Sequence, residues 1–282
     1  MSDNWIVRRE EFRSITDLLS VLSNRPNNDI MRHEHSSSDN GNSRWYGTNS
    51  MSEAIKIMGE GYKDAIVQMK QRLEESIKIN SKDYADVNHP VPHSAIVGYI
   101  PNVPNAIRGV PQSMISVDRK PMKRKTLQIM YSVGGSCQES REYFEKAGIA
   151  LLTAVDLIER SGVQTCIDLA FFTGCESIPG GREATFPTVR IKNYGERFSL
   201  QKVSFPLVHT SMFRRIGFKW LETTPVITGD FTGGYGRPLN SRECDEAYSK
   251  LCSANANYLS VAWINENDCD VKKILEKLGV VS

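Results

Sequence analysis

A strand–helix–strand pattern in the second half of the chain is the feature that most constrains how this sequence folds. Residues 126–133 form an apolar run, and a glycine-containing turn over 134–136 follows it. An amphipathic helix is predicted over 138–160, and residues 163–172 form a second apolar run. Two such strands joined by a helix pair in parallel through a right-handed crossover. The pattern therefore predicts an α/β core built around this unit.

Helices and strands go on alternating toward the end of the chain. The apolar spacing predicts strands over 185–194 and 258–264 and helices over 205–222, 241–253 and 268–278. Pro206 is expected in the first turn of its helix, where a missing N–H costs least. Alternation of this kind predicts an α/β fold with an open, mainly parallel sheet and helices on both faces.

Residues 1–121 lack this alternation and are predicted to lie apart from an α/β core at 122–282. Residues 23–49 are rich in serine, asparagine, aspartate and glycine, which predicts a polar loop. Residues 88–121 hold six of the twelve prolines, which excludes a helix over most of that segment. Two short strands are predicted within it, over 94–99 and 113–117.

Two helices are predicted in this first region. Apolar residues at helical spacing predict one over 11–22. A longer helix is predicted over 50–80, where Ser50 and Glu53 have the spacing of a capping box. Two glycines inside this second helix are expected to bend it.

The composition, 40% hydrophobic and 24% charged, is that of a globular protein and excludes a disordered chain or a fibre. No window approaches the ~18 apolar residues of a membrane helix. The N-terminus has no secretory signal, so we expect a cytoplasmic protein without a membrane partner. The six cysteines form no CxxC pair, which predicts reduced thiols and no zinc site.

Positive charge is unevenly distributed, although the net charge is only +2. Six lysines and arginines stand against one aspartate over 101–130, and eight stand against two glutamates over 180–220. Clustered basic residues suit polyanions, and a segment that also carries aromatics suits single-stranded nucleic acid. The predicted contact residues are Arg119, Lys120, Lys123, Arg124, Lys125, Phe213, Arg214, Arg215, Lys219, Trp220 and Trp45. The alternatives are a solvated strand entry at 119–125 and a core helix at 205–220 with its arginines exposed.

The turn after the first core strand reads Ser132-Val133-Gly134-Gly135-Ser136. With the helix that follows and Phe172-Thr173 after the second strand, it resembles the von Willebrand factor A domain. That family holds a divalent cation with an aspartate and two serines, and the resemblance implies a protein-interaction module. Here Ser132 and Gly134 replace the aspartate and the first serine, and only Ser136 is retained. We therefore expect no metal and no cofactor, but a tight turn or an anion site.

Signals for catalysis are sparse. Asp168 lies in an apolar strand without an identifiable partner, and His209-Thr210-Ser211 resembles half of the paired motif of two-histidine phosphoesterases. These residues leave a divergent hydrolase as one alternative. Residues 232–237 form a second glycine-rich stretch, for which a surface loop and a phosphate contact through Arg237 are the two readings.

The sequence as a whole resembles an uncharacterised group of bacteriophage proteins. The resemblance rests on Trp45-Tyr46-Gly47, on 103–114 and on Phe213-Arg214-Arg215-Ile216. It implies a phage product that acts in the host cytoplasm. Together with the basic and aromatic segments, it predicts a non-enzymatic protein that binds single-stranded DNA and recruits a phage RNA polymerase or replication machinery. The alternatives are an interaction module of von Willebrand A type and a divergent hydrolase.

Overall fold

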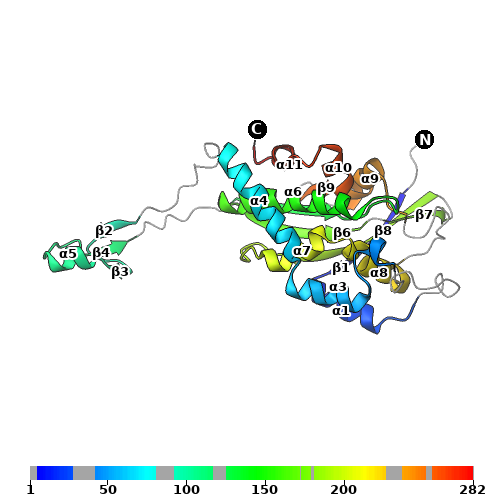
Figure 1. Cartoon of the computed structure of the whole chain (residues 1–282), viewed down its shortest axis with the longest axis horizontal. Coiled ribbons are helices and arrows are strands. Elements are labelled where there is room, and N and C mark those ends of the chain that lie inside the picture. Colours follow the sequence, from blue (N-terminus) through cyan, green and yellow to red (C-terminus); the bar gives the residue numbers. More distant parts are fainter. Residues whose placement is uncertain are drawn as a thin grey trace.

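The computed structural model describes most of the chain. The described residues are 5–27, 42–80, 92–116, 125–171, 173–178, 181–226, 237–251 and 256–281. Figure 1 shows a body of helices around one sheet, with a small unit that lies apart from it.

The body is built on a six-stranded mixed sheet. Its central path runs β1-β8-β6-β5-β9, and β7 pairs with β8 off this path. Most neighbours are parallel, whereas β8 runs antiparallel to β6 and β7. The predicted α/β fold with a mainly parallel sheet is confirmed. The strands are β1 (Trp5–Phe12), β5 (Thr126–Ser132), β6 (Gln164–Ala170), β7 (Thr173–Ile178), β8 (Gly181–Lys192) and β9 (Ala256–Ser260).

The predicted strand–helix–strand unit is present as β5, α6 (Arg141–Arg160) and β6. The Ser140 side chain caps α6 by accepting from the backbone N–H of Tyr143. The strands β5 and β6 pair in parallel, as expected from a helical crossover. The predicted strand at 185–194 largely coincides with β8. Strand β7 was not predicted. It pairs with β8 in antiparallel orientation, so the chain reverses its direction between the two strands.

Helices cover both faces of the sheet. The side chains of β5 alternate, so that Ile129 and Tyr131 enter the larger core while Met130 enters a smaller one on the other face. On the larger face, α6 makes its most extensive helix contacts with four other helices. They are α4 (Lys63–Asn80), α7 (Leu200–Val208), α10 (Val261–Glu266) and α11 (Val271–Lys277). Helix α9 (Ser241–Leu251) covers part of the other face with Cys244 and Ala247.

The N-terminal residues belong to this body, which corrects the expected separation at 121. Strand β1 pairs with β8, and α1 (Ile15–Asn24) begins only after it, so the helix predicted over 11–22 starts too early. Strand β1 was missed because both of its faces carry charge. Arg8 and Glu10 lie on one face, and Arg9 and Glu11 lie on the other.

The helix predicted over 50–80 is two helices, α3 (Met51–Glu60) and α4. Gly61 ends α3 with a φ of +83°, a conformation that favours glycine, and so the chain turns instead of bending. The Ser50 side chain caps α3 as predicted, by accepting from the N–H of Glu53. The Glu53 carboxylate reaches the N–H of Asn49 rather than that of Ser50.

The segment predicted as one helix over 205–222 is divided into three pieces. They are α7, the π-helical turn η2 (Met212–Gly217) and α8 (Phe218–Thr223). Pro206 lies inside α7 and not in its first turn, and the helix ends two residues later. The strand predicted over 258–264 is also shorter, because Ser260 caps α10 by accepting from the N–H of Trp263.

The small unit comprises residues 92–116. It is a three-stranded antiparallel sheet of order β2-β4-β3 with one short helix. Figure 1 shows it outside the layers of the body. Two short strands were predicted in the proline-rich segment, over 94–99 and 113–117, and the structure folds its middle into this unit. Its elements are β2 (His93–Ala95), β3 (Ile100–Pro101), α5 (Val103–Ile107) and β4 (Met114–Ser116).

Gly148 permits the close crossing of α6 and α7. A Cβ atom there would lie 2.3 Å from the Leu207 carbonyl oxygen and 2.7 Å from the Val208 Cα. We expect Gly148→Ala to lower the free energy of unfolding by about 1–3 kcal/mol, because two backbones must separate. Urea denaturation measures this. Gly59→Ala in α3, where nothing lies within 4 Å, is the matched control and should not destabilise the protein.

Candidate functional site

The turn between β5 and α6 lies at the carboxyl end of the parallel strands, where open α/β sheets usually bind ligands. In this protein the side chains of the turn are buried or hydrogen-bonded within the turn itself. The Ser132 side chain is buried, and the Ser136 hydroxyl accepts from the N–H of Gln138. Among the described residues, no group of three or more His, Cys, Asp or Glu side chains is arranged to hold a metal ion.

Arg214 closes this turn. Its guanidinium donates to the carbonyl oxygens of Ser136 at 3.1 Å, Glu139 at 2.7 Å and Trp45 at 2.8 Å. It also lies between two rings, 4.4 Å from the centre of Trp45 and 4.8 Å from that of Phe144. Burial lowers the pKa of this guanidinium to about 10. Arg214 therefore joins α2 (Ser43–Tyr46) to the turn and is not displayed to a ligand.

The basic and aromatic segment is core, which corrects the prediction of an exposed nucleic-acid surface there. Phe213, Arg214, Arg215 and Trp220 are each at most 2% exposed. The Arg215 guanidinium donates to the side chain and the carbonyl of Thr48. The expectation that the two arginines would be exposed on a core helix is wrong as well. The hydrogen bonds of the two guanidinium groups go to groups inside the protein, from Arg214 to three backbone carbonyl oxygens and from Arg215 to Thr48.

The other predicted contact residues fall into two groups. Lys125 is exposed, whereas Trp45 and Lys219 are half-buried, and the Lys219 ammonium donates to Asn27. Trp45 docks its segment on the body, since its indole N–H donates to the Cys137 carbonyl at 2.8 Å. Several candidates of the sequence analysis lie outside the described part of the chain, namely Arg119, Lys120, Lys123, Arg124, Phe172, the stretch 232–236 and residues 28–41 of the predicted polar loop.

The two candidate catalytic groups have structural partners. The Asp168 carboxylate accepts from the Arg190 guanidinium at 2.5 and 3.2 Å and from Gln128 at 2.9 Å. His209 is buried beside the rings of Phe205 and Tyr62, and its Nδ1 accepts from the N–H of Ser211. Burial, reinforced by the charge of Arg141, lowers the pKa of the imidazole to about 3.

A pocket of about 610 Å³ lies on the sheet face opposite α6, where α9 does not cover the strands. It collects residues from three strands that are far apart in sequence: Arg9, Glu11, Phe12, Arg13, Asp168, Thr188, Arg190 and Asn193. Sequence reasoning found only Asp168. The run of four charged residues at 8–11 was the available signal, but no strand was assigned to it.

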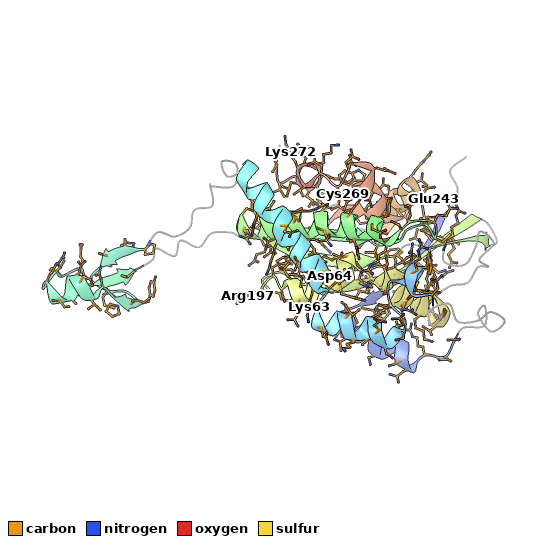
Figure 2. All side chains as sticks on the ribbon, in the orientation of Figure 1. Lys63, Asp64, Arg197, Glu243, Cys269 and Lys272 are labelled. Carbon is orange, nitrogen blue, oxygen red and sulfur yellow. The ribbon has the colours of Figure 1, made fainter. Side chains whose placement is uncertain are left out.

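Exposed apolar side chains gather on the unit 92–116. Ile107 and Val97 are 82% and 81% exposed, and Figure 2 shows the side chains of the unit at a distance from those of the body. The remaining large apolar side chains exposed on the unit are Ile96, Tyr99, Ile100, Val103 and Val110. None of the residues 92–116 is buried.

Comparison with known proteins gives one match, to the domain of unknown function DUF7192, over residues 6–282. The chain belongs to this family. No curated protein and no solved structure matches it. None of the helices described in this DUF7192 chain is both long enough and apolar enough to cross a membrane.

Arg214 provides a stability test. We expect Arg214→Met to lower the free energy of unfolding by about 2–4 kcal/mol, because three backbone carbonyl oxygens lose a hydrogen bond from a buried guanidinium. Chemical denaturation of the purified variant measures this. Arg44→Met changes an exposed arginine of α2, the helix to which Arg214 bonds, and should leave stability unaltered. Equal stability of Arg214→Met and wild type would contradict the bridging role.

His209 provides a pH test. Its pKa lies below its ordinary value of 6.5 in the folded state, so below that pH the unfolded chain binds a proton that the folded chain does not. Stability from this group is complete above pH 6.5 and falls by up to about 1.4 kcal/mol per unit as the pH drops toward 3. His209→Asn keeps an acceptor for Ser211 but cannot titrate. Denaturation at several pH values should show that the variant loses less free energy of unfolding than wild type as the pH falls. Stability curves of the two proteins that run parallel against pH would refute the assignment.

Proposed function

We propose that this protein is a non-catalytic interaction protein whose copies associate through the unit 92–116. The observation that carries the proposal is the group of seven large apolar side chains exposed on a unit that has no buried residue of its own. Contiguous exposed apolar surface of this kind usually marks a protein contact. The bodies of the associated copies would remain free to bind other molecules.

The size of the unit favours association. Chain segments below about 40 residues usually need disulfides, a metal or oligomerisation to hold a fold. Residues 92–116 contain no cysteine, and no metal-binding cluster occurs among the described residues. Of the three stabilising devices, oligomerisation is the one that this composition leaves open. About 20–30 residues on each side is also the usual size of a specific interface.

The charge of the unit favours a second copy as the occupant. Arg108 is the only residue of 92–116 with a full formal charge at neutral pH, so two units meet without strong repulsion. The described part of the body offers no comparable apolar partner. Its exposed large apolar side chains are isolated on different elements, at Ile6, Ile55, Val67 and Tyr194. Packing of unit against unit is therefore the contact we propose.

The non-catalytic part of the proposal is supported by the partners of Asp168 and His209. A carboxylate held by an arginine and a buried neutral imidazole are poorly placed to act on a substrate. The phage origin, the likeness to von Willebrand A domains and the recruitment of a polymerase stay predictions. The family description names none of these properties.

Analytical ultracentrifugation of the full chain tests the association. We expect a dimer or larger species to form between about 1 and 100 μM, the range of an interface worth about 5–8 kcal/mol. Val97→Lys with Ile107→Lys should abolish it, because charge would have to be buried between the copies. Val67→Lys on α4, 56% exposed in the wild type, is the matched control and should associate normally.

Two outcomes would overturn this proposal. One is a wild-type chain that stays monomeric over the whole range. The other is a double variant that associates as strongly as wild type. Circular dichroism of the double variant separates loss of contact from loss of fold, because both replaced side chains are more than 80% exposed and their substitution should leave the body folded.

A further inference from the structure

The pocket on the open sheet face has an excess of hydrogen-bond donors. Arg190 is already committed, because its guanidinium donates to both oxygens of Asp168 and, at 3.3 Å, to the side-chain oxygen of Asn193. This bond to Asp168 is also the main cause that raises the pKa of Arg190. Asp168 accepts in addition from Gln128. The buried carboxylate is thus neutralised and needs nothing from a ligand.

The donors left over belong to Arg9, Arg13 and Asn193. The Arg13 guanidinium makes no hydrogen bond or ion pair with the described residues. Arg9 uses its Nε on Thr188 at 2.8 Å and one amino group on Glu11 at 3.0 Å, which leaves its other amino group. Asn193 accepts from Arg190 through its oxygen, so its amide N–H groups are directed elsewhere.

The lining of the pocket carries a net positive charge. Three arginines stand against two carboxylates, of which Asp168 is buried and paired. The second, Glu11, is 69% exposed, so its ion pair with Arg9 is weak and easily displaced. Planar guanidinium groups bind phosphate through two parallel hydrogen bonds. We infer that Arg9, Arg13 and Asn193 bind the phosphate group of a ligand in this pocket.

The pocket lies at the edge of the sheet where β5 starts, the edge at which Lys125 also lies. Arg13 follows β1 and Asn193 follows β8, and both strands run opposite to β5 and β6. Their ends therefore lie at the edge where β5 starts, and there the Lys125 carbonyl accepts from the N–H of Gln164. Lys125 is the last residue of the basic run 119–125 and is the part of that run that the structure describes. A ligand with several phosphates in a row would be attracted along this edge.

Fluorescence anisotropy with a labelled single-stranded oligothymidine of about 10 nucleotides tests the inference, with inorganic phosphate as competitor. We expect Arg13→Glu to weaken binding about tenfold. The slope of log affinity against log salt concentration should become shallower by about one, which corresponds to one lost phosphate contact. Arg44→Glu makes the same change of charge on α2, at the opposite edge of the sheet, and should have little effect. Glu11→Gln should strengthen binding about twofold, because a competing carboxylate is removed.

The source of the phosphate follows from the two probes. Tight oligonucleotide binding that millimolar phosphate displaces only weakly assigns the pocket to a nucleic-acid strand. Comparable binding of phosphate and oligonucleotide assigns it to a small phosphorylated ligand. The inference is overturned if neither probe binds at low salt, or if Arg44→Glu loses as much affinity as Arg13→Glu. Neither outcome depends on whether copies of the protein associate through the unit 92–116.

Discussion

Helix α6 is the element on which the body depends. It lies on the sheet, and α4, α7, α10 and α11 all pack against it. Its crossing with α7 is close because Gly148 has no side chain to hold the two backbones apart. A single helix in contact with the sheet, with these four helices and with α2 makes the core continuous from α1 to α11.

Much of the positive charge in the chain is bonded within the fold. Lys192 is buried, pairs with Glu159 at 2.8 Å and donates to the Thr165 carbonyl. Arg190 neutralises Asp168, and Arg214 satisfies backbone carbonyls at the β5–α6 turn. Part of the basic excess over 180–220 is therefore internal, whereas Arg197 and Lys202 are exposed. Charge counted along a sequence does not distinguish a cation that satisfies a buried acceptor from one that faces a ligand.

Two exposed surfaces of different chemistry remain after this internal pairing. The unit 92–116 presents uncharged apolar side chains, and the pocket of Arg9 and Arg13 presents unused donors. The first suits another protein surface and the second suits a phosphate group. Because they lie on separate parts of the molecule, a chain that associates through the unit keeps its pockets available. Two or more pockets in one assembly would bind a long polyanion more tightly than one.

The strand–helix–strand unit and the helix caps at Ser50 and Asn240 were determined by the sequence, because periodicity and capping are local. The tertiary structure decided which charges are exposed, since that depends on contacts between distant residues. Strand β1 shows the limit most clearly. Its eight residues carry charge on both faces, and only pairing with β8 makes them a strand. That pairing places Arg9 and Arg13 beside Asp168 and so creates a pocket that no local pattern predicts.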